Sequence, residues 1–235
     1  MRIGPLTSLL ASTYGIPEPT VTVVARSMRE AGLLTTGARG VNAPEMAMKD
    51  VARLTLALMT GEPPSKVVEE YRFIASLQTV DLFPVKGWIS SNELFEGHSF
   101  EEAVIEVFEA MNDNRRRQAF STTASGLTHP PSTQVYLDSS RRVARLELYD
   151  VSAEYTNLAG QRRLAELYAT RPMTLEAWKQ IEVIEVSGAT SYDSSMTVPG
   201  RGMRVIRSIT QDEVFAICSA IQSEAVHDTA QSNLR

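Results

Sequence analysis

The sequence predicts an α+β protein, in which a helical first half is followed by a region of mostly antiparallel strands. Apolar residues recur at helical spacing up to about residue 112. A stretch rich in arginine, serine, threonine and proline interrupts this pattern at residues 115–132. Beyond it, β-branched and apolar residues alternate with polar ones, as in half-buried strands. With 43% hydrophobic residues, the 235-residue chain can form a packed core.

The first part of the chain predicts three helices. A helix over residues 6–14 is followed by a Gly-Ile-Pro-Glu turn and by a second helix over Pro19–Ala31. Proline is tolerated in the first turn of a helix because the N–H that it lacks would be unsatisfied there. A glycine-rich turn covers residues 35–40, and a third helix with one apolar face covers residues 47–60.

The middle segment predicts two more helices, over residues 65–77 and 99–112. The second begins with Ser99-Phe100-Glu101-Glu102, which has the Ser-x-x-Glu pattern of a capping box. We interpret Glu101 and Glu102 as capping and helix-dipole residues. The aromatic stretch at residues 80–95 is expected to be an ordered but irregular connection.

The last part predicts strands and one helix. Residues 133–137 and 142–149 flank a polar turn and should form a hairpin. Two further strands are expected at residues 181–187 and 203–209, on either side of a long loop, whereas residues 155–180 fit a helix or a strand equally well. A final helix should begin at Thr210-Gln211-Asp212-Glu213 and end near Ala225, with the last ten residues frayed.

The net charge also changes between the first part, the middle segment and the last part of the chain. The net charge is +2 over residues 1–61, −8 over residues 62–114 and +1 over residues 115–235, which gives −5 in all. We therefore expect a basic N-terminal domain (1–61), an acidic helical segment (62–114), a linker (115–132) and an α+β domain (133–235). The overall negative charge means that any contact with nucleic acid must use a local basic patch.

The first two helices have the spacing of a helix-turn-helix. The small residue Ala11 lets two helices cross closely, and Gly15 can adopt the positive φ that the turn needs. Val21 can anchor the second helix against the first, together with Leu10, Ile16, Val24 and Met28. With that face buried, the second helix would turn a row of mainly polar residues outward, where they could enter a major groove.

This stretch resembles the winged helix-turn-helix of bacterial and phage regulators. The family's small residue, glycine and apolar anchor fall on Ala11, Gly15 and Val21, and residues 29–34 look like the end of its recognition helix and its first wing strand. Residues 38–44, Ala-Arg-Gly-Val-Asn-Ala-Pro, are similar to a segment of uncharacterised phage and prophage proteins. The resemblance covers about the first quarter of the chain and implies a wing tip at residues 37–40.

From this resemblance we expect a non-enzymatic protein that binds double-stranded DNA and inserts its second helix into the major groove. It would act as a phage or prophage transcriptional regulator. Its place would be the cytoplasm of a bacterial or phage-infected cell. Few phosphate contacts are available, so tight binding would require a homo-oligomer. The residues expected to contact DNA are Thr20, Thr22, Val23, Arg26, Ser27, Arg29, Arg39 and Lys49.

Two other functions fit the same sequence. The protein could be a subunit of a viral DNA-packaging machine, similar to a small terminase, which would form a larger ring with looser sequence preference. It could also be an interaction protein whose helix-turn-helix no longer binds DNA. In either case the α+β domain would provide an oligomerisation surface or a surface for a protein partner.

The sequence contains no pattern that predicts catalysis, a cofactor or a metal site. The three histidines are not spaced as metal ligands, and the single cysteine, Cys218, lies on the apolar side of the final helix with Val214 and Ile221. A lone cysteine excludes an internal disulfide and is typical of cytoplasmic proteins. No apolar run is long enough to cross a membrane, and no secretory signal is recognised.

Overall fold

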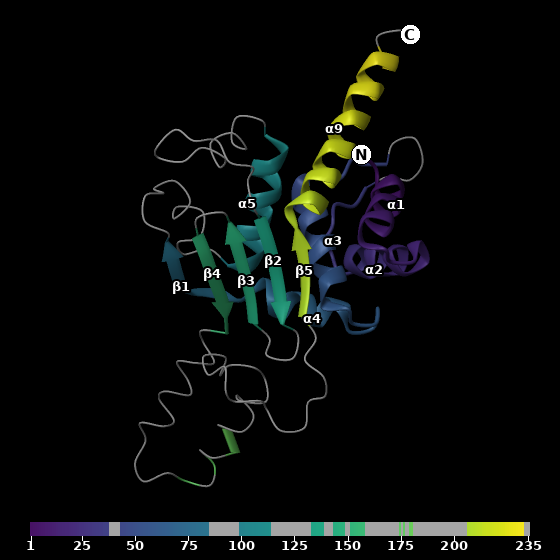
Figure 1. The fold of residues 1–235 in the computed structure, drawn as a ribbon. Coiled ribbons are helices and arrows are strands. Elements are labelled where there is room, and N and C mark those ends of the chain that lie inside the picture. Colours follow the sequence, from purple (N-terminus) through teal and green to yellow (C-terminus); the bar gives the residue numbers. More distant parts are fainter. Residues whose placement is uncertain are drawn as a thin grey trace.

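The computed structural model describes residues 1–37, 43–84, 99–113, 133–138, 143–148, 151–157, 174, 176, 179–180 and 206–232. The first half is helical and the strands follow mainly in the second half, so the predicted α+β class is confirmed (Figure 1). The helices are α1 (Ile3–Tyr14), α2 (Glu18–Glu30), α3 (Met48–Thr60), α4 (Val67–Ala75), α5 (Phe100–Asn112) and α9 (Gln211–Ser232).

The strands form one antiparallel sheet in the order β1-β4-β3-β2-β5. Helices α3 and α5 lie against one face of this sheet, and the α1–α2 pair lies beyond its β5 edge (Figure 1). The strands are β1 (Gln78–Pro84), β2 (Thr133–Asp138), β3 (Val143–Leu148), β4 (Val151–Thr156) and β5 (Ile206–Thr210).

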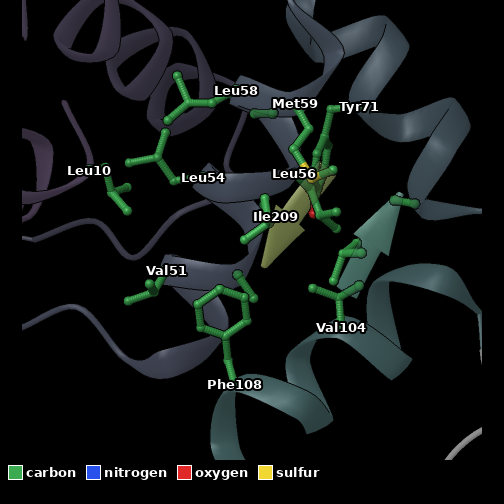
Figure 2. Close-up of a cluster of buried hydrophobic side chains, with 14 of the residues drawn as sticks. Leu10, Val51, Leu54, Leu56, Leu58, Met59, Tyr71, Val104, Phe108 and Ile209 are labelled. Atoms are coloured by element: carbon green, nitrogen blue, oxygen red, sulfur yellow. The ribbon is translucent and has the colours of Figure 1, made fainter. Parts of the chain in front are cut away.

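The hydrophobic core fills the space between the helices and the sheet. Figure 2 shows Val51 of α3 next to Phe108 of α5, and Ile209 of β5 lies between Leu54 of α3 and Val104 of α5. Buried side chains of all six helices above belong to the same cluster, as do those of β2, β3, β4 and β5. The division of the chain at residues 61, 114 and 132 stays a prediction. Described residues of the 1–61, 62–114 and 133–235 regions share one hydrophobic core.

A polar network runs through this core along one side of α3. The Asp50 side chain is fully buried and accepts hydrogen bonds from the backbone N–H and hydroxyl of Thr35 and from the N–H of Ala47, all at 2.8 Å. One turn later, Arg53 donates to the carbonyl of Leu33 at 3.1 Å and to Glu101 of α5 at 2.5 Å. The network therefore joins the connection after α2 to both α3 and α5.

Tyr71 of α4 completes the network by donating to Glu101 at 2.9 Å. Burial and the neighbouring Glu101 carboxylate raise the pKa of Tyr71 above its ordinary value, so its hydroxyl stays protonated and remains a donor. Burial alone would lower the pKa of Arg53, but the hydrogen bond and negative charge of Glu101 raise it instead. Glu102 makes the expected cap of α5, and Glu101 lies in the first turn as expected but also binds the side chains of Arg53 and Tyr71 on two other helices.

Several expected elements are confirmed. The predicted hairpin forms as β2 and β3, with Leu137 paired to Ala144. Ser99 and Glu102 make the expected capping box, since Glu102 N–H donates to the Ser99 hydroxyl and Glu102 accepts from Ser99 N–H at 2.8 Å. At the start of α9, the N–H and the hydroxyl of Thr210 both donate to the Glu213 carboxylate, at 2.6 and 2.9 Å.

Three expectations need correction. Residues 78–84, expected in part as an irregular connection, form β1, because they pair with β4 more than 65 residues later in the chain. Leu33-Leu34 forms no wing strand: Leu34 is buried in the core, and Thr35 is held by Asp50 instead of by a strand partner. The chain end does not fray at residue 226, because α9 continues to Ser232.

Other expectations fall outside the described residues. These include the wing tip around Arg39, the linker at 115–132, the strand at 181–187 and the loop after it. The strand expected at 203–209 is found as β5, shifted to Ile206–Thr210. Helices α1 and α2 begin three residues and one residue earlier than predicted, respectively.

Gly61 ends α3 at the point where β5 passes it. Its φ is +63°, and a Cβ atom there would overlap the guanidinium of Arg207, which donates to the carbonyl of Thr60 at 2.9 Å. Gly15 has the same φ with open space around it.

We expect Gly15→Ala to lower the free energy of unfolding by about 1 kcal/mol through the backbone alone. Gly61→Ala should lower the free energy of unfolding by about 1 kcal/mol more than Gly15→Ala does, because Arg207 must give up its hydrogen bond.

Urea unfolding of the two variants measures this difference directly. Arg207→Ala is the matched background, since without the guanidinium the extra loss at Gly61 should disappear. Equal losses for Gly15→Ala and Gly61→Ala would contradict the packing of β5 on the end of α3.

Removal of the Asp50 carboxylate should destabilise the protein strongly. Asp50→Ala leaves the N–H groups of Thr35 and Ala47 without their acceptor, and each unsatisfied donor costs about 1–3 kcal/mol. We expect a total loss of about 3 kcal/mol or more in urea unfolding. Thr35→Val, which removes only one hydroxyl donor, should cost about 1 kcal/mol. A loss below about 1 kcal/mol for Asp50→Ala would show that the network does not hold the connection after α2.

Candidate nucleic-acid interface

Helices α1 and α2 are joined by a short turn and pack against each other beyond the β5 edge of the sheet (Figure 1). The turn is tight because the N–H groups of Gly15 and Ile16 both donate to the carbonyl of Ala11, and Gly15 adopts φ +63°. Only glycine takes this conformation without steric cost. The predicted role of Gly15 is thus confirmed, and Ala11 is buried beside it.

The inner face of α2 packs as its apolar spacing predicts. Val21, Val24 and Met28 are all buried, together with Ala25. The helix begins at Glu18, whose carboxylate accepts a hydrogen bond from the Ser8 hydroxyl of α1 at 2.7 Å. Contacts at both the apolar face and the helix start fix the position of α2 on α1.

The outer face of α2 carries most of the residues expected to contact DNA. Thr20, Thr22, Val23 and Arg26 are exposed, and Ser27 is half-buried beside them. The Val23 side chain is 46% exposed, which makes it one of two large apolar side chains on the surface of the described residues; the other is Phe215 of α9, at 44%. An exposed valine between polar residues can contact a thymine methyl group in a major groove.

Two hollows border this outer face. On one side, Thr22, Arg26 and Arg29 line a groove of about 690 Å³ between α2 and the start of α1. The groove is completed by Ile3, Gly4, Thr7, Ala25, Glu30 and Thr36. On the other side, Thr20 and Val24 border a hollow of about 460 Å³ that reaches Tyr14, Arg207 and Glu213. Thr20 therefore lines a different hollow from Thr22, Arg26 and Arg29.

The two arginines of α2 differ in their environment. Arg26 is exposed and donates to Glu30 at 2.8 Å, and this hydrogen bond and the charge of Glu30 raise its pKa. Arg29 is half-buried, and within the described part of the chain no group accepts a hydrogen bond from its buried Nε atom. Leaving such a donor unpaired costs about 1–3 kcal/mol. Of the two arginines of α2, Arg29 is therefore the one without a partner among the described residues.

The remaining expected residues lie apart from this cluster or outside the described residues. Lys49 is exposed in the first turn of α3 and lines neither hollow. Arg39 falls outside the described residues. Sequence reasoning missed Gly4 and Thr36, which reach the groove only because α1 and the connection after α2 fold back beside Arg29. Helical spacing alone could not bring those segments together.

Neither a metal site nor a membrane span emerges from the described residues. No three His, Cys, Asp or Glu side chains there gather closely enough to hold a metal ion. No helix in that part of the chain combines the length and apolar character needed to cross a bilayer. Cys218 is buried in α9 as expected, with its thiol against the carbonyl of Phe108.

Comparison with known proteins gives no family for this chain. No protein-family model matches it, and no curated protein or solved structure is significantly similar. Function must therefore be argued from the geometry of the helix pair itself.

Proposed function

We propose that the chain is a non-enzymatic DNA-binding protein in which α2 enters the major groove of double-stranded DNA. The observation that carries this proposal is the outer face of α2, where an exposed valine lies among threonine and arginine side chains on a helix fixed from its inner side. A rigid helix with an uncovered, mixed polar and apolar face has the shape and chemistry that a major groove accepts.

The charges of this face favour modest affinity. Arg26 is neutralised in part by Glu30, and Glu18 and Glu30 balance the two arginines of α2. Two or three phosphate contacts would give a slope of about −2 to −3 in a plot of log K against log salt concentration. Tight binding would then require several copies of the chain, as in a regulator of phage or prophage origin that acts as an oligomer in the cytoplasm.

Val23→Glu tests the proposal without disturbing the core. Val23 is exposed, so the fold should survive, while a carboxylate at the centre of the face should repel the phosphates. We expect at least a tenfold loss of affinity for a fluorescent duplex in anisotropy titrations at low salt. Phe215→Glu is the matched control, because it places the same charge at an equally exposed apolar residue on another helix, and it should leave the affinity unchanged.

Two results would contradict the proposal. The first is the absence of duplex binding by the unmodified protein even at low salt, which would leave the helix pair as an interaction surface. The second is an equal loss of affinity for Val23→Glu and Phe215→Glu, which would mean that binding depends on total charge and not on α2.

A further inference from the structure

The groove between α1 and α2 contains an unpaired cation in a partly enclosed position. Arg29 lines it; the residue is half-buried, and its buried Nε atom has no hydrogen-bond partner among the described residues. Burial of a charge without a partner is unfavourable, so half-buried arginines normally contact an anion or several acceptors. The described residues around Arg29 supply neither.

The other polar groups of the groove are donors or are already neutralised. The hydroxyls of Thr22 and Thr36 make no hydrogen bond to another described residue, and Thr7 donates to the carbonyl of Gly4 at 2.8 Å. Glu30 is the one carboxylate lining the groove, and it accepts from Arg26 at 2.8 Å. Among the described residues that line the groove, Arg29 therefore carries the one uncompensated positive charge.

The first turn of α1 opens into the same groove. Ile3 and Gly4 line it, and no side chain caps the start of this 12-residue helix. The first N–H groups of a helix have no partner within the helix and carry a partial positive charge. A Cβ built on Gly4 would meet no atom within 4 Å, so a ligand can approach the backbone closely at this residue.

We propose that this groove binds a phosphate group, with Arg29 as its principal ligand and the first turn of α1 and the hydroxyls of Thr22 and Thr36 as further donors. This inference rests on the proposed function: when α2 lies in a major groove, the phosphate is a phosphodiester of the DNA strand that passes the start of α1. Arginine suits this ligand because its planar guanidinium can donate two parallel hydrogen bonds to phosphate oxygens.

Inorganic phosphate is the first probe of the groove. Phosphate that binds only the folded protein should raise its Tm in a saturable way, when compared with sodium chloride of equal ionic strength. In chloride, Arg29→Met should be at least as stable as the unmodified protein, because it removes an unpaired charge; in phosphate it should show no added shift. Arg72→Met, at an exposed arginine on α4, should keep the full phosphate shift.

A duplex titration distinguishes the phosphodiester from free phosphate. Arg29→Met should reduce duplex affinity at least tenfold and lower the salt slope by about one, while Arg72→Met leaves both unchanged. A phosphate shift without any change in duplex affinity would overturn the assignment to DNA. A phosphate shift that persists in Arg29→Met, or no shift in the unmodified protein, would overturn the groove as a phosphate site. In either case the response of duplex binding to Val23→Glu would still test the proposed function separately.

Discussion

The buried carboxylate of Asp50 and the guanidinium of Arg53 join the connection after α2 to helices α3 and α5. Both lie on α3, one turn apart, and their partners come from the connection after α2 and from α5. A buried charge is tolerated only when its hydrogen bonds are complete, so each partner must occupy a defined position. This requirement fixes the end of α2, and through it the helix pair, against the helices that cover the sheet.

The hydrogen bonds between Asp50 and Thr35 also affect the proposed DNA-binding surface. Because Thr35 is held by Asp50, the chain after α2 turns back toward α3 and brings Thr36 to the edge of the groove that contains Arg29. The same contacts leave the outer face of α2 uncovered, since no described segment crosses it. The polar network on α3 thus positions the connection after α2 and, with it, one wall of the groove.

Local patterns in the sequence predicted the local structure well. The Ser99 and Thr210 caps, the turn at Gly15 and the inner face of α2 follow from residues within one or two helical turns of each other, so their chemistry can be read without the fold. The hairpin of β2 and β3 was equally accessible, because a short polar turn joins two alternating strands.

Features that depend on distant segments could not be predicted in this way. The strand β1 forms because β4 lies beside it, and the sequence near Leu82 gives no sign of that partner. The Leu33-Leu34 pair looked like a wing strand, but the buried Asp50 captures Thr35 and Leu34 enters the core. Arg29 could be predicted as a DNA contact from its charge alone. Its position in a groove, without a hydrogen-bond partner among the described residues, depends on segments that only the fold brings together.

Hydrogen exchange followed by mass spectrometry, with and without a saturating duplex, tests the central claim most directly. The account predicts that DNA slows exchange in α2 and in the first turn of α1, while the amides of the sheet and of α9 are unchanged. Protection confined to the sheet or to α9, or no protection anywhere under conditions where the duplex is bound, would contradict the assignment of the α1–α2 pair as the DNA-binding surface.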